Sequence, residues 1–113
     1  MSLLSSLKTI LATLKIPAET GVFSSTPAPG VYCVLVPLGE SLECADDIPE
    51  CEVPSVRISL FAKGAYTTTA RSIREAVIVA GHTITESRYI GHEDDTGYNH
   101  YIIDVEECYS WEE

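Results

Sequence analysis

The sequence has few basic residues, and two long stretches have none. Its 113 residues include seven Lys and Arg against 17 Asp and Glu, which gives a net charge of −10. Six acids lie between Glu40 and Glu52 and eight between Glu93 and Glu113. Binding nucleic acid by neutralising phosphates needs clustered basic residues, so the composition argues against that function. The acidic stretches form either a solvated face or a surface that lies near DNA without binding it.

Long apolar runs are also missing. None approaches the roughly 20 residues that a membrane-spanning helix needs, so we expect no membrane partner. Apolar residues near the start of the chain recur at helical spacing (Leu3, Leu4, Leu7, Ile10, Leu11 and Leu14). This spacing predicts an amphipathic helix rather than a targeting segment. The helix should end before Pro17, because the residue preceding a proline disfavours helical geometry.

The chain lacks the common catalytic and nucleotide-binding motifs. It has no G-x-S-x-G, no phosphate-binding G-x-x-x-x-G-K and no G-x-G-x-x-G. Its four cysteines (Cys33, Cys44, Cys51 and Cys108) form no C-x-x-C, and with no secretory signal this predicts a reduced, cytosolic state. A disulfide or a zinc site at Cys44 and Cys51 is the lesser alternative. We expect no catalytic residue, no cofactor and no metal.

The middle of the chain predicts strands and a second helix. The β-branched run "VYCVLVP" (31–37) is typical of a central strand buried on both faces, and "SVRISLFAKG" (55–64) alternates as a half-buried strand. Between them, residues 38–54 are predicted to be an acidic loop or an excursion from the sheet. Residues 66–81 predict a helix with a Ser72/Glu75 capping box and Gly81 as terminator. A short extended piece, "GVFSS" (21–25), should precede the first strand.

The stretch "YIGHEDDTGYNHYIIDVE" (89–106) predicts the turn of a C-terminal β-hairpin, with Gly97 in or near a positive-φ conformation. In that register His92 lies near Asn99 and His100 is one position away, so the two histidines project from opposite faces. A metal site of His92, His100 and one nearby acid (Glu93, Asp94 or Asp95) is therefore a lesser alternative, as is acid/base chemistry by the same acids. Glu86 and Arg88 are expected to be surface charges, and His82 a helix-end or loop residue.

The order of these motifs resembles that of small tail-completion and head-tail joining proteins, including tail terminators, of tailed bacteriophages and prophages. The resemblance rests on the first helix, the strand "PGVYCVLVP", the acidic "ADD", the strand "VRISLFAKGAY", the helix ending at Gly81 and the strand "TGYNHYIIDV". It implies an α+β fold over one domain, residues 1–113, with an antiparallel sheet flanked by two α-helices. The cysteine-containing segment between Cys44 and Cys51 departs from the pattern.

The resemblance also implies a structural, non-catalytic role in virion assembly. The chain would assemble as a homo-oligomeric ring, commonly a hexamer, at the head-tail junction beside connector, portal or tail-tube proteins. DNA would pass through it without specific binding, and the protein would occur in the virion and, during assembly, in the bacterial cytoplasm. Candidate interface segments are 38–54, the hairpin tip 94–97 and the aromatic C-terminal segment. Two alternatives stay open: a small acidic protein-binding module unrelated to phage, and an enzyme with an unrecognised site in 38–54.

Overall fold

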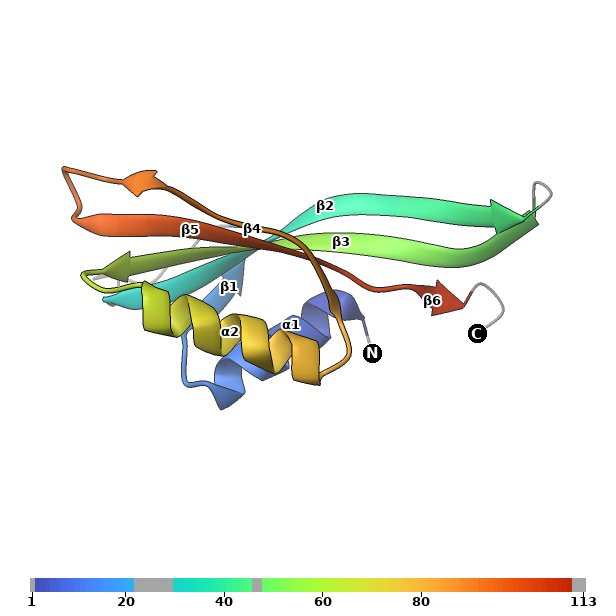
Figure 1. Ribbon diagram of the computed structural model, residues 1–113, viewed down its shortest axis with the longest axis horizontal. Helices are drawn as coiled ribbons and strands as arrows, with labels where there is room; N and C mark the ends of the chain where they lie inside the picture. Colours follow the sequence, from blue (N-terminus) through green and yellow to red (C-terminus); the bar gives the residue numbers. More distant parts are fainter. Residues whose placement is uncertain (1, 22–29, 46–47, 111–113) are drawn as a thin grey trace.

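The computed structural model describes residues 2–21, 30–45 and 48–110, with the backbone alone for 41–51 and 110. Two helices and six strands follow one another along the chain (Figure 1): α1 Leu3–Thr13, β1 Ala18–Thr20, β2 Val31–Ala45, β3 Ile48–Lys63, α2 Thr67–Val79, β4 Thr83–His92, β5 Tyr98–Glu106 and β6 Tyr109–Ser110. The predicted α+β fold is confirmed. Most of the expected "GVFSS" piece lies outside the described residues.

The strands form one sheet in the order β1-β2-β3-β5-β4, and β6 pairs with β3. All neighbours are antiparallel except β1, which runs parallel to β2. The prediction of an antiparallel sheet therefore holds for its main strands, but it missed the short parallel edge strand. Both helices lie on the same face of the sheet (Figure 1).

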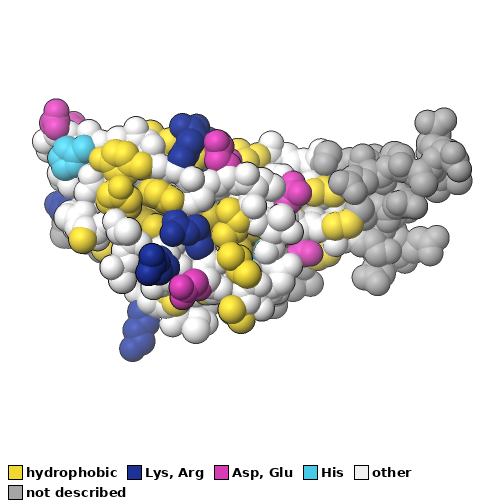
Figure 2. Space-filling view, in the orientation of Figure 1, with side chains coloured by type: hydrophobic (Ala, Val, Ile, Leu, Met, Phe, Trp, Pro, Cys, Tyr) yellow, Lys and Arg dark blue, Asp and Glu magenta, His cyan; other side chains and the backbone are white. Residues whose placement is uncertain are grey.

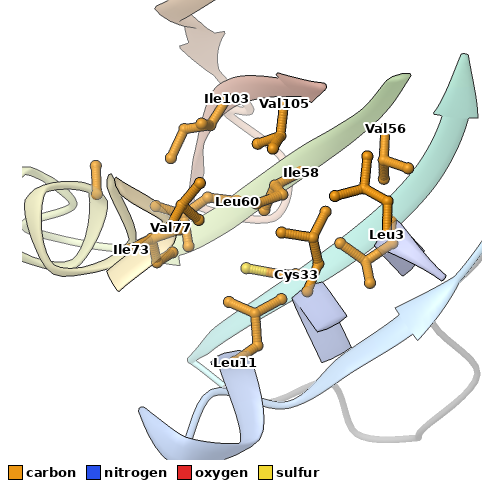
Figure 3. Close-up of a cluster of buried hydrophobic side chains, with 13 residues drawn as sticks. Leu3, Leu11, Cys33, Val56, Ile58, Leu60, Ile73, Val77, Ile103 and Val105 are labelled. Atoms are coloured by element: carbon orange, nitrogen blue, oxygen red, sulfur yellow. The ribbon is translucent and has the colours of Figure 1, made fainter. Parts of the chain in front are cut away.

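The core lies between the two helices and the sheet. Ile58 and Leu60 of β3 are fully buried beneath them, as the alternation of this strand predicted. The helices contribute Leu7 and Leu11 from α1 and Ile73 from α2, each fully buried. Figure 3 shows these side chains converging with those of β2 and β5. Packing of the amphipathic helix faces on this apolar sheet face is the main stabilising interaction of the fold.

The prediction of a loop over 38–54 is wrong. Strands β2 and β3 stay paired from Val31↔Ala62 to Ala45↔Ile48, so this segment is a two-stranded extension of the sheet, which we call the β2–β3 ribbon (residues 38–45 and 48–54). It projects past the helices along the longest axis of the molecule (Figure 1). The register shifts between Pro37 and Gly39, where Gly39 has φ +127°, and such bulges interrupt the alternation by which strands are recognised. The alternative expectation, an excursion from the sheet, is closer to the structure.

The capping box predicted at Ser72 and Glu75 is wrong. Helix α2 begins at Thr67 after Tyr66, whose side chain makes no capping hydrogen bond. Ser72 lies inside the helix and its hydroxyl donates to the Thr68 carbonyl at 3.1 Å. The threonines before it already adopt helical geometry, so the start of α2 lies earlier than the sequence motif indicated.

Both helices end in the same backbone motif, with one residue in the left-handed region. In α2 this residue is the predicted Gly81 (φ +94°), whose N–H donates to the Ile78 carbonyl at 3.0 Å. In α1, which ends before Pro17 as expected, it is Lys15 (φ +61°), whose N–H donates to the Ala12 carbonyl at 3.0 Å. A Cβ is disfavoured in this conformation, so Lys15 holds backbone strain that Gly81 avoids.

We expect Lys15→Gly to raise the free energy of unfolding by about 1 kcal/mol, because glycine adopts positive φ without a Cβ clash. Urea-induced unfolding of the monomer measures the change. Lys15→Ala is the control, since it removes the long side chain but keeps the Cβ and should give no comparable gain. A destabilised Lys15→Gly variant would contradict this interpretation of the α1 terminus.

Candidate interaction surfaces

The acidic turn between β4 and β5 is the tip of a hairpin, as predicted. The Glu93 N–H donates to the Tyr98 carbonyl at 2.8 Å, and the Gly97 N–H donates to the Glu93 carbonyl at 2.7 Å. Gly97 has φ +82°, which confirms its predicted conformation. The Thr96 hydroxyl donates to the Glu93 carboxylate at 2.9 Å. Each of these contacts stabilises the turn, and the exposed acids leave the tip strongly negative.

The two hairpin histidines lie on opposite faces of the sheet. His92 pairs with Asn99 and its Nδ1 lies 3.1 Å from the Asn99 side-chain oxygen, whereas His100 pairs with Gly91. His92 also lies 3.9 Å from the fully exposed Asp94 carboxylate. Within the described parts of the chain, no three His, Cys, Asp or Glu side chains gather as metal ligands. The geometry therefore separates the residues of the hypothetical hairpin site, and the absence of metal and cofactor stays a prediction.

An aromatic cluster lies on the sheet face opposite the helices. Phe61 of β3 stacks between Tyr32 and His100, with ring centroids 4.9 and 4.4 Å apart, and Tyr98 meets Tyr32 edge-on at 5.3 Å. The Lys63 ammonium lies 5.0 Å from the centre of the Tyr98 ring. Burial lowers the pKa of His100 and raises that of Tyr32, so both stay uncharged at neutral pH. The cluster therefore connects β2, β3 and β5 through contacts between their rings.

One ion pair lies beside this cluster on the same face. The Arg57 guanidinium donates to both Asp104 carboxylate oxygens, from Nε at 2.8 Å and from Nη2 at 3.1 Å. The Asp104 side chain is 10% exposed and that of Arg57 34%. The hydrogen bonds to Asp104 raise the pKa of Arg57. This bidentate ion pair links the central strands β3 and β5.

A hydrogen-bonded chain of three side chains was not foreseen from the sequence. Ser6 Oγ of α1 lies 2.8 Å from His82 Nε2, and His82 Nδ1 lies 2.5 Å from the Glu107 carboxylate. The His82 side chain is only 7% exposed. The expectation that His82 lies at a helix end is correct, but it also links α1 to the segment after β5. The two partners of His82 are distant from it in the sequence, so no local motif predicts these contacts.

Replacing His82 with Ala should lower the free energy of unfolding by about 1–3 kcal/mol, because it leaves the Ser6 hydroxyl and Glu107 carboxylate without their buried partner. Thermal and urea unfolding measure the loss. His92→Ala is the matched control: that side chain is 47% exposed, so its loss should change stability by less than about 0.5 kcal/mol. Equal effects of the two substitutions would show that the hydrogen bonds of His82 to Ser6 and Glu107 add no more stability than a surface contact.

The cysteines do not all follow the expectation of a reduced protein. Cys108 is disulfide-bonded, while Cys33 is free and fully buried in the core. Burial raises the pKa of the Cys33 thiol to about 12, which keeps it protonated and unreactive. The side chains of Cys44 and Cys51, for which a disulfide or zinc site was the lesser alternative, lie outside the described part of the structure.

The predicted interface segments include side chains that pack within the chain and side chains that are exposed to solvent. The C-terminal Tyr109 packs against the chain's own core and β6 pairs with Cys51 and Glu52 of β3, while Trp111 lies outside the described residues. The ribbon has an exposed apolar side chain at its base, Leu38, at 46%. Further large apolar side chains are exposed at the end of α2 and along β4 (Ile78, Val79, Tyr89 and Ile90).

An open pocket of ≈ 320 Å³ lies where α1 ends and α2 begins. Its apolar wall comes from Leu14, Ile16 and Val31, and residues of α2, including Thr68 and Thr69, line the other side. Lys15, the strained residue that ends α1, also lines it. The pocket therefore combines an apolar surface with a positive charge at its edge.

No protein-family model and no curated protein matches the sequence. Within the described residues, no helix is both long enough and apolar enough to cross a membrane. Among solved structures, the fold is similar to that of a chain described as "Virion of native gene transfer agent (GTA) particle", with a TM-score of 0.55 and 16% sequence identity. The match covers 88% of this chain and 82% of the other. At this identity the similarity shows a shared fold.

Proposed function

We propose that this protein is a structural component of a phage-like virion, which joins head to tail or completes the tail and assembles as a ring at the head-tail junction. The observation that carries the proposal is the fold shared with a chain of a virion particle, over 88% of this sequence. The order of motifs in the sequence independently resembles that of phage head-tail joining and tail-completion proteins. Both support the virion as its location, and we propose that the protein occurs in the bacterial cytoplasm during assembly.

The charge of the chain supports passage of DNA rather than binding. Each copy carries −10, and a ring concentrates this charge around its axis. An acidic lumen repels phosphates, so a genome can slide through without being held. Subunits of like charge also repel one another, and apolar interface area has to offset that repulsion. Exposed side chains such as Val79 (86%) and Ile78 (60%) supply apolar surface for this purpose.

Light scattering and DNA binding test this proposal together. We expect the protein to form rings alone or on a portal or tail-tube partner, and to leave duplex DNA unbound even at low salt. Tight DNA binding at low salt would overturn the acidic-lumen part of the proposal. A chain that stays monomeric and also ignores portal and tail-tube proteins would instead favour a small acidic binding module.

The contacts of Ser6, His82 and Glu107 favour one second candidate, a hydrolase, because a nucleophile, a base and an orienting carboxylate are hydrogen-bonded in sequence. Hydrolysis also needs donors for the developing oxyanion and room for a substrate. The N–H of Ser6 is already bonded to the Ser2 carbonyl, and none of the three residues lines the described pocket. We therefore assign this group a structural role and the protein no catalytic activity.

A fluorophosphonate probe, which labels activated serines, separates these two functions. We expect no labelling of Ser6 in the folded protein. Labelling that disappears in His82→Gln, with the fold intact by circular dichroism, would establish an activated serine and contradict the non-catalytic role. The same probe on a known serine hydrolase serves as the positive control.

A further inference from the structure

We propose that the β2–β3 ribbon of one copy docks onto the helical layer of a second copy, at the pocket where α1 ends and α2 begins. The inference rests on the proposed function, since it names the interface through which a ring closes. It is carried by three observations: the segregation of charge, the projection of the ribbon backbone past the helices, and the placement of pocket and ribbon at opposite ends of the molecule.

Charge is divided between the helices and the ribbon. The two helices and the turn after α1 hold four of the seven basic residues and one of the 17 acids (Lys8, Lys15, Arg71, Arg74 and Glu75). Figure 2 shows basic side chains over this part of the surface. The stretch from Glu40 to Glu52 holds six acids and no base. The helical layer is therefore the part of the chain whose charge complements the ribbon, and such complementarity sets orientation and excludes other pairings.

Among the residues that the structure describes, no helix lies over the ribbon. Figure 1 shows α1 and α2 beneath the other half of the sheet, while the ribbon extends beyond them. Strand β6 pairs with it only at Cys51 and Glu52. Two-stranded ribbons are marginally stable by themselves and gain stability by packing on another element. The helical layer of a neighbouring copy provides such an element.

The pocket suits a strand that carries apolar and acidic residues. Its apolar wall, formed in part by Leu14 and Ile16, suits apolar side chains of a strand, and Lys15 at its edge suits a carboxylate. Thr68 on the α2 side is exposed, so an incoming strand can reach its hydroxyl. A volume of ≈ 320 Å³ admits a few side chains of a strand.

The geometry favours a ring over a closed dimer. Along the longest axis, 51 Å, the end of β2 and the start of β3 lie at one end, and the end of α1 and start of α2 lie toward the other (Figure 1). Docking ribbon to pocket joins two different surfaces, so each copy can bind one neighbour at each end. Such head-to-tail contacts continue until the rotation between copies closes the ring.

Charge reversal on each side of the interface tests this directly. The pocket variant, Lys15→Glu with Thr68→Glu, and the ribbon variant, Glu40→Lys with Glu52→Lys, should each stay monomeric, because each places like charges together. Mixed one to one, the two variants should recover the wild-type oligomer mass. The basic ribbon of the ribbon variant fits the acidic pocket of the pocket variant, and the wild-type ribbon of the pocket variant fits the wild-type pocket of the ribbon variant. The control, Arg88→Glu with Thr83→Glu, makes the same change of charge at two exposed positions of β4, outside the helical layer and the pocket, and should assemble as wild type.

Light scattering at about 0.15 M salt, where the screening length is about 8 Å, suppresses long-range repulsion but keeps contacts at the interface. Wild-type chains that stay monomeric at every concentration, or variants that assemble as wild type, would overturn the docking. So would single variants that fail and do not rescue each other when mixed. If the wild type still binds a portal or tail-tube protein in these cases, the proposed virion role stands and only the ribbon interface is wrong.

Discussion

Replacing Ile58 with Ala is expected to lower the free energy of unfolding by about 2–5 kcal/mol, the largest effect of any single change considered. Ile58 is fully buried in β3, with Leu35 of β2 on one side and Ile103 of β5 on the other. Removing its outer carbons leaves a cavity that these paired strands cannot close. Urea unfolding, with the slope checked for two-state behaviour, measures the loss.

Ile78→Ala is the matched control for this substitution. The same side chain is removed, but Ile78 is 60% exposed near the end of α2, so the expected change is within about 0.5 kcal/mol. Losses of similar size at the two positions would mean that the core does not lie between helices and sheet as described.

Asp104→Ala is expected to cost about 1.5–3 kcal/mol, because it removes two charge-assisted hydrogen bonds and leaves Arg57 without its partner. The two side chains connect β3 and β5 from the face opposite the helices, with distances of 2.8 and 3.1 Å. The unpaired guanidinium, 34% exposed, recovers part of the loss by hydration, which sets the upper limit of the estimate. Thermal unfolding monitored by circular dichroism measures the change.

Glu86→Ala gives the matched control for a surface ion pair. Glu86 lies 3.3 Å from Arg88, and the side chains are 48% and 55% exposed, so the pair should contribute less than about 0.5 kcal/mol. A double substitution of Arg57 and Asp104 to Ala isolates the coupling between these two residues. Coupling energy near zero would show that the buried pair adds no more than the exposed one.

Local patterns predicted the parts of the fold that depend on neighbouring residues. Alternation in β3 correctly assigned Val56, Ile58 and Leu60 to the buried face. The Asp-Thr-Gly turn predicted the β4–β5 hairpin and the positive φ of Gly97, because few residues tolerate that conformation. Helical spacing likewise identified α1, with Leu7 and Leu11 buried.

Strands that are defined by pairing with distant residues could not be predicted from local patterns. Strands β1 and β6 have three and two residues, too few to show a period, and pairing with β2 and β3 defines them. The ribbon was interpreted as a loop because acids, prolines and register shifts hide its strands, although pairing across the hairpin holds them together. Tertiary pairing therefore overrode weak local preference in each case.

At the candidate surfaces, too, contacts between neighbouring residues were predictable and contacts between distant residues were not. The sequence separated His92 from His100 correctly, because faces alternate along a strand. It could not join Ser6 to His82, which lie 76 residues apart and meet only when α1 packs beside α2. The positive charge of the helical layer is likewise not visible in the sequence, because its basic residues are spread over two helices that become neighbours only in the fold.

Electron microscopy of particles from a producing strain that lacks this gene tests the central claim, a structural role at the head-tail junction. The account predicts DNA-filled heads separate from tails, or tails of abnormal length, and normal particles again when the wild-type protein is supplied. The pocket variant with Lys15→Glu and Thr68→Glu should fail to restore them if the ring closes through the ribbon. Normal, joined particles in the complete absence of the protein would contradict the claim.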